Sequence, residues 1–225
     1  MKYPAARILV FAKAPIPGQV KTRLAPVLTD SEAAHLHARL VRHTLATATQ
    51  QPLCPVELWC APDATHPFFQ QCRQQYNITL RHQCEGDVGQ RMEQALNATL
   101  QTSESAILIG TDCPEFTTDD LEAALGLLNP PRQTTTDAPA LVLGPAEDGG
   151  YVLIGARRCH PSLFSHIEWG TDNVLATTRQ RIQTLGWHWQ ETRTFWDLDR
   201  PEDWRRYQRQ GKRGEVAAWQ GTMPS

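Results

Sequence analysis

Short runs of apolar residues alternate with amphipathic or polar stretches along the chain. The apolar runs are rich in β-branched residues and are bounded by Gly, Pro or Asp, which is typical of buried strands. The run 106–109 is apolar throughout, as expected of a central parallel strand. The strands predicted from these runs are 8–12, 56–61, 78–83, 106–109, 141–144, 151–155 and 192–196.

The stretches between these runs carry helix signals. Thr29 and Glu32 form a capping box, Asp87 is placed to cap a second helix, and Thr117 begins a third. Pro201 suits the first turn of a closing helix, with acidic residues at the positive end of the helix dipole. The predicted helices are 30–50, 64–76, 86–101, 118–128, 173–185 and 202–209.

The order of these elements predicts an α/β fold. Alternating strands and helices favour a mostly parallel sheet with helices on both faces. The strands on either side of 144–150 are joined by a short turn, so one of them is expected to be antiparallel to the rest. The 225 residues, 40% of them hydrophobic, are enough for one such domain without a second.

Charge and composition exclude several classes of protein. A formal net charge of −2 argues against a nucleic-acid partner. No apolar run is long enough for a membrane span, and the N-terminus lacks the pattern of a signal peptide, so a cytoplasmic protein is expected. The six cysteines lack the close spacing of a zinc site and are expected to be thiols. Cys113 has no His nearby in sequence that would favour a nucleophilic role.

The loop after the first strand is a candidate phosphate site. Pro15, Pro17 and Gly18 forbid helix and sheet, so the chain leaves the strand as a stiff loop. Lys21 and Arg23 follow directly. In open α/β sheets a loop at the carboxyl end of a buried strand commonly binds a phosphorylated ligand. The alternative is a solvated surface loop with ordinary basic residues.

Carboxylates follow other strands. Asp112 comes directly after the strand 106–109, which places its carboxylate at the edge of the core, where a hard divalent cation is a natural partner. Asp112 could instead cap the turn at 113–114. Asp197 and Asp199 alternate along an extended segment and are expected to share a face. They could hold a cation together, or one of them could cap the helix that begins at Pro201.

Two further stretches carry weaker signals. Asp148 precedes Gly149 and Gly150, which either let the backbone approach a ligand closely or only form the hairpin turn. Trp169 and Thr171 precede the helix 173–185, where Thr171 is an ordinary helix cap. The His residues, including His35 and His37, lack the spacing of metal ligands and are expected to be surface or packing residues.

Three of these segments together resemble the DUF2064 family, described as candidate glycosyltransferases of the GT-A, nucleotide-diphospho-sugar transferase superfamily. The residues that carry the resemblance are 11–15 with 17–24, then 110–114, then 147–151, in this order along nearly the whole chain. The stretch 197–203 is similar to the acidic ending of the molybdenum-cofactor and phospholactate guanylyltransferases.

The resemblance implies one GT-A domain over 1–225, a three-layer α/β/α sandwich with a Rossmann-like sheet whose first strand and following loop hold the nucleotide. The positions that match nucleotide-binding residues are Ala12, Lys13, Pro17, Gly18, Lys21, Arg23, Thr111 and Asp112. The positions that match metal ligands are Asp112, Asp197 and Asp199. Catalytic roles fall to Lys21, Arg23 and Asp148, and substrate-binding roles to Gly149, Gly150, Trp169 and Thr171.

The function implied is transfer of a sugar from a nucleotide-diphospho-sugar to a small acceptor, with Mg²⁺ or Mn²⁺ as cofactor. The sequence departs from the pattern at Gly170, where Ser is expected, and at Cys113, so that no Asp-x-Asp pair follows the strand. This departure leaves nucleotidyl transfer open, in which a phosphorylated small molecule attacks an NTP and pyrophosphate leaves. A nucleotide-binding protein without catalysis is a third alternative.

Overall fold

A seven-stranded sheet runs through the part of the chain that this computed structural model describes, residues 1–130 and 138–211. In spatial order its strands are β3 (Thr79–His82), β2 (Val56–Ala61), β1 (Ala6–Lys13), β4 (Ser105–Ile109), β6 (Tyr151–Ala156), β5 (Leu141–Pro145) and β7 (Trp189–Glu191). Neighbouring strands are parallel except β6, which is antiparallel to both β4 and β5. The predicted mostly parallel sheet with one antiparallel strand is therefore confirmed.

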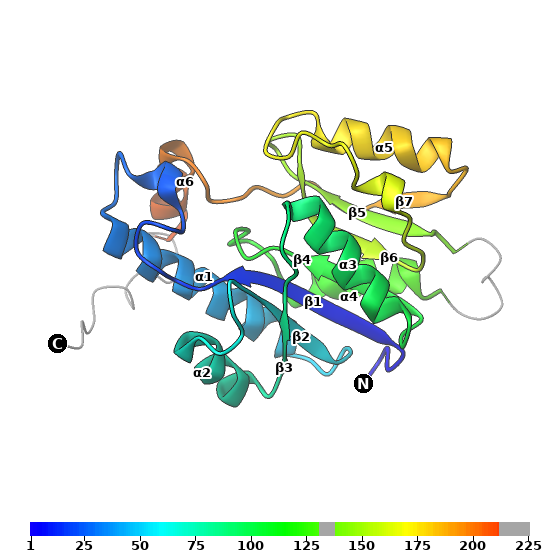
Figure 1. Ribbon diagram of the computed structural model, residues 1–225, viewed down its shortest axis with the longest axis horizontal. Helices are drawn as coiled ribbons and strands as arrows, with labels where there is room; N and C mark the ends of the chain where they lie inside the picture. Colours follow the sequence, from blue (N-terminus) through cyan, green and yellow to red (C-terminus); the bar gives the residue numbers. More distant parts are fainter. Residues whose placement is uncertain (131–137, 212–225) are drawn as a thin grey trace.

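Helices cover both faces of this sheet (Figure 1). One face packs against α1 (Asp30–Thr49), α2 (Pro67–Tyr76) and α4 (Thr118–Leu128), and the other against α3 (Val88–Leu100) and α5 (Val174–Thr184). Successive side chains of β1 alternate between the two faces: Ile8 and Val10 belong to the first core, Leu9 and Phe11 to the second. The result is a three-layer arrangement with a core on each side of the sheet.

The chain reverses its direction across the sheet at β1. From β1 it moves to β2 and then to the edge strand β3, and it returns to place β4 on the opposite side of β1. At such a reversal the connections after the two central strands diverge, which leaves a crevice outside their carboxyl ends. The fold therefore places a candidate ligand site above Lys13 and Gly110.

A third, smaller core joins distant parts of the chain. Leu24 of the single turn η1 (Thr22–Leu24), Leu36 and Leu40 of α1, and Trp196 and Leu198 are all buried together. Trp204 and Tyr207 of α6 (Pro201–Gly211) pack against them. Figure 1 shows α6 beside the N-terminal loop, which agrees with the contacts between α6 and η1. This core fixes the loop after β1 against the segment 196–199.

The caps predicted at Thr29, Asp87 and Thr117 are confirmed, each as a capping box. The α2 helix begins three residues later than predicted, because Pro67 occupies its first turn and the His66 side chain accepts a hydrogen bond from the Phe68 N–H. None of the described helices is long and apolar enough to cross a bilayer.

The predicted strand 192–196 is wrong in position. The last strand, β7, ends at Glu191; beyond it the Thr192 N–H still donates to Leu143, and Phe195 pairs with Ala146 in an isolated bridge. The regular pairing of β5 with β7 ends at Leu143 and Glu191, and the register of β5 with β6 shifts just beyond, between Gly144 and Pro145. Beyond Phe195, therefore, no neighbouring strand directs side chains alternately to two faces, and Asp197 lies outside the sheet.

Candidate active site

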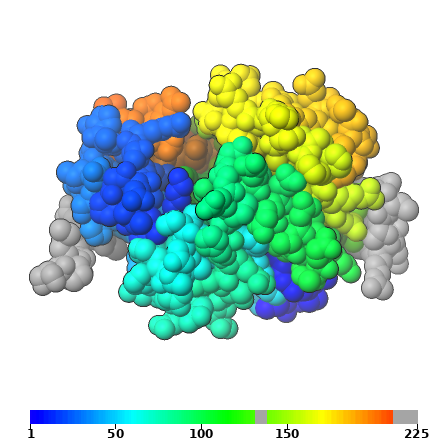
Figure 2. Space-filling view, viewed as in Figure 1, coloured from blue at the N-terminus to red at the C-terminus, as the bar shows by residue number. Residues whose placement is uncertain are grey.

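A cleft of about 540 Å³ opens at the carboxyl ends of β1 and β4. We call it the main cleft; in Figure 2 it lies between the blue N-terminal segment and the green segment around α3. Its lining comes from the loop after β1, from α1, from the β3–α3 connection and from the end of β4. The lining residues are 11–13, 19–23, His37, Gln83, Gly86, Val88, Arg91, 110–112 and Asp199.

Lys21 is the centre of the cleft's charged end. Its side chain is 2% exposed, and its ammonium lies 2.7 Å from Asp112 Oδ1. The same ammonium donates a hydrogen bond to the Leu198 carbonyl oxygen, while the Leu198 N–H donates to the Asp112 carbonyl oxygen at 2.7 Å. Lys21 itself has φ +52°, a left-handed conformation that non-glycine residues rarely adopt. One lysine thus joins the loop after β1, the end of β4 and the segment 197–199.

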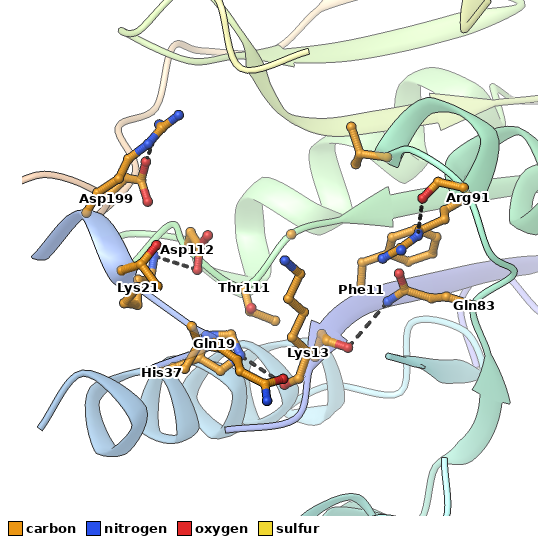
Figure 3. A pocket seen from close by; sticks show the side chains of 17 residues that line it. Phe11, Lys13, Gln19, Lys21, His37, Gln83, Arg91, Thr111, Asp112 and Asp199 are labelled. Atoms are coloured by element: carbon orange, nitrogen blue, oxygen red, sulfur yellow. Dashed lines mark hydrogen bonds and ion pairs between the residues drawn. The ribbon is translucent and has the colours of Figure 1, made fainter. Parts of the chain in front are cut away.

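Asp112 is held as a carboxylate by this contact. Burial of the carboxyl group is the largest single effect and raises its pKa, but the charge and hydrogen bond of Lys21, together with the charges of His37 and Lys13, outweigh it, so that the net pKa lies below the usual value. Oδ1 is fully covered, whereas the side chain as a whole is 44% exposed. The remaining exposed surface of the carboxylate faces the cleft (Figure 3).

Arg23 and Asp199 form a second ion pair at the rim, with 2.7 Å between Nη1 and Oδ2. The Asp199 side chain therefore does not cap α6 through any contact described for it. Asp203 has that role, because its carboxylate accepts from the Asp199 and Arg200 N–H groups at the start of the helix. The Arg23 side chain is 56% exposed, so that it is accessible to a ligand as well as to Asp199.

Asp112, Asp148 and Asp199 all lie close enough to Asp197 for their charges to act on its carboxyl group. Burial, followed by the charges of Asp148 and Asp112, raises the pKa of Asp197 to about 6, and Asp199 adds to the effect. The segments expected to bring acids to one rim of the sheet do so. Asp197 and Asp199 nevertheless face different spaces: Asp199 lines the main cleft, and Asp197 lines a neighbouring pocket.

That neighbouring pocket, of about 190 Å³, is called the side pocket here. Asp197, Tyr151, Met92, Leu108, Val152 and Ile154 line it, and it shares Phe11, Val88, Gly110 and Asp112 with the main cleft. Gly110 lies at the junction, where a Cβ atom would meet no other atom within 4 Å. The two spaces therefore adjoin at Gly110 and Asp112, which line both.

The DUF2064 family model, described as an uncharacterized protein conserved in bacteria, matches residues 44–171, which is more than half of the chain. The chain belongs to this family. The matched residues include Asp112 and Asp148, whereas Lys21 and Arg23 precede them and Asp197 and Asp199 follow. No curated protein matches the sequence of this DUF2064 member.

Solved structures show the same fold. A candidate nucleotide-diphospho-sugar transferase from Desulfovibrio desulfuricans G20 is 27% identical, with a TM-score of 0.80 over 95% of this chain and 90% of the other. The inositol-1-phosphate CTP transferase of T. maritima is 12% identical, with a TM-score of 0.58 over 89% of this chain and 91% of the other. Glucosyl-3-phosphoglycerate synthase of Mycobacterium tuberculosis, solved with Mn²⁺ and UDP, is 9% identical, with a TM-score of 0.53 over 89% of this chain and 74% of the other. The predicted GT-A fold is confirmed, and these neighbours are transferases, the class predicted for this chain.

The sequence-predicted nucleotide-binding residues of this DUF2064 member are largely brought together. Ala12, Lys13, Lys21, Arg23, Thr111 and Asp112 all line the main cleft. Figure 3 shows the Lys13 side chain extending into the cavity. Pro17 and Gly18 are exposed and, among the described residues, do not belong to the lining. They form the turn before residues 19–23, which line the cleft.

The residues predicted to bind the second substrate are placed differently. Asp148 Oδ1 accepts from the Gly150 N–H at 2.9 Å, and Gly149 has φ +88° with its Cα against the Asp172 backbone, where a Cβ would lie 2.1 Å from the carbonyl oxygen. Trp169 packs edge-on against Tyr151, and the Thr171 hydroxyl donates to Glu168. Within the described part of the chain, none of Gly149, Gly150, Trp169 and Thr171 lines the main cleft or the side pocket. The Gly149 carbonyl oxygen accepts from the Leu175 N–H at the start of α5, but the prediction that Thr171 caps this helix is wrong, because its N-cap is Asn173 without a side-chain hydrogen bond. The ligand role of these four residues stays a prediction.

His37, Gln83 and Arg91 are among the lining residues that sequence reasoning missed. His37 is buried in α1, where its Nε2–H donates to the Lys13 carbonyl oxygen at 3.0 Å, and burial lowers its pKa. The Gln83 amide donates to the Ala12 and Trp59 carbonyl oxygens at 3.3 and 2.7 Å. Arg91 Nε donates to Gly86 at 3.0 Å. Gln83 directly follows β3, so the rule that ligands bind beyond the ends of strands could have identified it. The helical spacing of His37 with the buried Val41 and Leu45 could have shown that His37 faces inward.

Cys113 is excluded as a nucleophile. It is 1% exposed, and burial raises the pKa of its thiol to about 12. Only a thiolate is an effective nucleophile, so the thiol at this position is a packing group of the first core.

The carboxylate oxygens of Asp112, Asp197 and Asp199 suit a hard divalent cation such as Mg²⁺ or Mn²⁺, because these ions prefer oxygen ligands. No three His, Cys, Asp or Glu side chains in 1–130 and 138–211 are arranged to hold an ion by themselves. Asp199 is paired with Arg23, which leaves the exposed face of Asp112 and the carboxylate of Asp197. Mg²⁺ commonly binds through one or two carboxylates plus substrate phosphates. Asp112 and Asp197 fit an ion completed in this way, and a metal role for all three acids stays a prediction.

Proposed function

We propose that this chain transfers a sugar from a nucleotide-diphospho-sugar to a small acceptor and uses Mg²⁺ or Mn²⁺. The observation that carries the proposal is the buried Lys21, which joins Asp112, Leu198 and the loop after β1 at the reversal point of the sheet. The names of the structural neighbours, which include transferases that act with UDP or CTP, support the same class of reaction.

The reaction requires positive charge around the leaving group. Breaking the bond between the sugar and the diphosphate builds negative charge on the leaving oxygen, and fixed cations that face this oxygen lower the barrier. The side chains of Lys13, Lys21, Arg23 and Arg91 line the main cleft. A divalent ion on Asp112 and Asp197, when bound, would neutralise further charge on the diphosphate.

The individual roles follow from position. Lys21 and Arg23 bind phosphate oxygens, and the buried pair of Lys21 with Asp112 fixes where the ammonium stands. His37 and Gln83 position the end of β1, because they bond the Lys13 and Ala12 carbonyl oxygens. Asp148, whose charge contributes to the raised pKa of Asp197, is retained as the candidate for acceptor positioning or general base.

Nucleotidyl transfer is the second candidate. The observation in its favour is that Gly110 and Pro114, and not a second Asp, stand two residues on either side of Asp112, so that no Asp-x-Asp pair stands at the end of β4. The same cations would serve this reaction, but the electrophile is then a phosphorus atom of an NTP. The leaving group is pyrophosphate instead of a nucleoside diphosphate, so analysis of the released product separates the two reactions.

The test is a thermal-shift screen of nucleotides and nucleotide-sugars with and without Mn²⁺. A ligand at a hundred times its Kd stabilises the folded state by about 2.7 kcal/mol, which raises Tm by roughly 5–10 °C in a chain of this size. We expect the best donor to reach this range only with Mn²⁺, and Asp112→Asn to lose the metal-dependent part.

Asp119→Asn, which changes an exposed acid in the first turn of α4, is the matched control and should keep the full shift. An Asp112→Asn protein with an unchanged metal-dependent shift would remove Asp112 from the site. Nucleotide binding without release of nucleoside diphosphate or pyrophosphate, over a broad acceptor panel, would favour a binding protein instead of an enzyme.

A further inference from the structure

The first turn of α3 is in direct contact with Trp169, which lies far along the chain. Gly89 is the second residue after the Asp87 cap of this helix. A Cβ at Gly89 would lie 2.5 Å from Cζ2, 2.6 Å from Nε1 and 2.7 Å from Cε2 of the Trp169 indole. All three separations are shorter than a Cβ atom tolerates, so only glycine allows the indole to lie against the helix backbone here.

The indole is held in this place by the second core. Its ring meets the Tyr151 ring edge-on, with 6.4 Å between centroids and 83° between planes, and it packs against the buried residues of that core. Its Nε1 atom is covered by the protein and, among the described residues, has no hydrogen-bond partner. A buried N–H without an acceptor destabilises a fold, and Phe at this position would avoid that cost. The contribution of Trp169 is therefore the size and position of its ring, and not a hydrogen bond.

The turn beneath the indole forms one wall of the main cleft. Its lining residues are Gly86, Val88 and Arg91. Asp87 and Gln90 form a capping box, and Arg91 Nε donates to the Gly86 carbonyl oxygen at 3.0 Å, so that the turn is braced by its own hydrogen bonds. A displacement of Gly89 would therefore move the lining residues of this turn together.

The residue after Trp169 reaches the opposite wall. Gly170 has φ +83°, and a Cβ at this position would lie 3.7 Å from Arg23 Nη2. Arg23 belongs to the N-terminal segment, which faces the segment around α3 across the main cleft (Figure 2). Because consecutive Cα atoms are only about 3.8 Å apart, the pair 169–170 links the two walls rigidly.

We propose that Trp169 is a positioning residue for the donor site. Through Gly89 it sets where the first turn of α3 stands, and with Gly170 beside Arg23 it sets the separation of Arg23 and Arg91 across the main cleft. Two guanidinium groups bind a diphosphate well only when both reach its oxygens, so their separation decides the affinity. The inference rests on the proposed function, in which the donor's diphosphate occupies the main cleft. Trp169 then acts through the turn of α3 instead of by contact with a ligand.

The test exchanges volume between the two contacting residues. Gly89→Ala pushes the turn away from the indole, and Trp169→Phe leaves a gap, because Phe lacks the outer part of the indole. Each change should raise the Kd for a nucleoside diphosphate about fivefold or more, and the double variant should regain most of the affinity, because the methyl group takes the vacated space. Isothermal titration calorimetry of the full chain with UDP, CDP, GDP, ADP and dTDP, in excess Mg²⁺, measures these values.

Two matched controls carry the same changes elsewhere. Gly126→Ala adds a methyl group to α4, where there is room for it. Trp187→Phe shortens a ring that packs edge-on against His160 and, in the part of the chain that is described, lines neither the main cleft nor the side pocket. Neither control should change the Kd. Urea unfolding without ligand separates affinity from stability, because a merely structural Trp169 would lower the free energy of unfolding and leave the Kd unchanged.

Unchanged Kd values in folded Gly89→Ala and Trp169→Phe proteins, or a double variant that binds no better than the single ones, overturn the inference. If Gly89→Ala alone does not fold, Trp169→Phe with and without Gly89→Ala decides in the same way. Binding of none of the five nucleotides by the unmodified protein would contradict the proposed function together with the inference, whereas binding that the substitutions do not change contradicts the inference alone.

Discussion

Replacement of Lys21 by Met should lower the rate of transfer about a hundredfold or more, because it removes a fixed cation from the leaving diphosphate. The same change should lower the free energy of unfolding by about 1–3 kcal/mol. Lys21 is buried and pairs with Asp112 Oδ1, which is covered and would be left without its cation. Steady-state kinetics and urea unfolding measure the two effects.

A double substitution separates the structural effect from the catalytic one. Lys21→Met with Asp112→Asn removes the unpaired charge and should regain part of the lost stability, while activity stays low. Lys2→Met is the matched control: Lys2 forms an exposed ion pair with Glu122, and such pairs contribute about 0–1 kcal/mol. A Lys21→Met protein with native activity would show that the ammonium does not face the reacting phosphates.

The second large effect is expected at Gly110. A Cβ at this position meets open space, and the Gly110 N–H, which donates to Val152, is kept by any residue except proline. Gly110→Val should therefore fold with nearly unchanged stability. Its side chain projects into the space where the main cleft adjoins the side pocket, beside Asp112, so that a donor bound in the main cleft is displaced from the reacting geometry. Misplacement of this size costs on the order of a hundredfold in rate.

Two further substitutions test whether the loss of rate depends on the size and the place of the added side chain. Gly110→Ala should have an intermediate rate, because one methyl group narrows the junction less. Gly126→Ala adds the same methyl group on α4, where its nearest neighbour outside the helix is the Tyr3 hydroxyl at 3.4 Å, and should leave the rate unchanged. Native transfer by a stably folded Gly110→Val protein would show that the donor does not lie over residue 110.

The sequence predicts most of the fold because its signals are local. Capping boxes at Thr29, Asp87 and Thr117 depend on residues three apart, and the apolar run 106–109 identifies the central strand by itself. The short turn after Gly144 is sufficient to predict an antiparallel strand. The last strand is misplaced because its position depends on which residues of β5 it pairs with, 141–143, and no residue within 192–196 indicates this.

For the site, the sequence identifies the groups but not their partners. The positions of the acids after predicted strands, and of Lys21 and Arg23 after the first loop, predict these groups as site residues. The burial of Lys21 and its hydrogen bond to Leu198 depend on the small core of Leu24, Trp196 and Leu198. This core forms from segments far apart in the sequence, so no local pattern predicts it. Asp197 and Asp199 were expected to share a face, but Asp199 turns to Arg23 while Asp197 turns to the side pocket, because the chain there is not a strand.

The most direct measurement is anomalous diffraction from crystals grown with Mn²⁺ and the nucleotide-sugar that gives the largest thermal shift. The account predicts a manganese peak beside the Asp112 carboxylate, with the diphosphate along Lys13 and Lys21 in the main cleft. A nucleotide bound elsewhere, or a main cleft without nucleotide at a concentration that stabilises the protein, would contradict it.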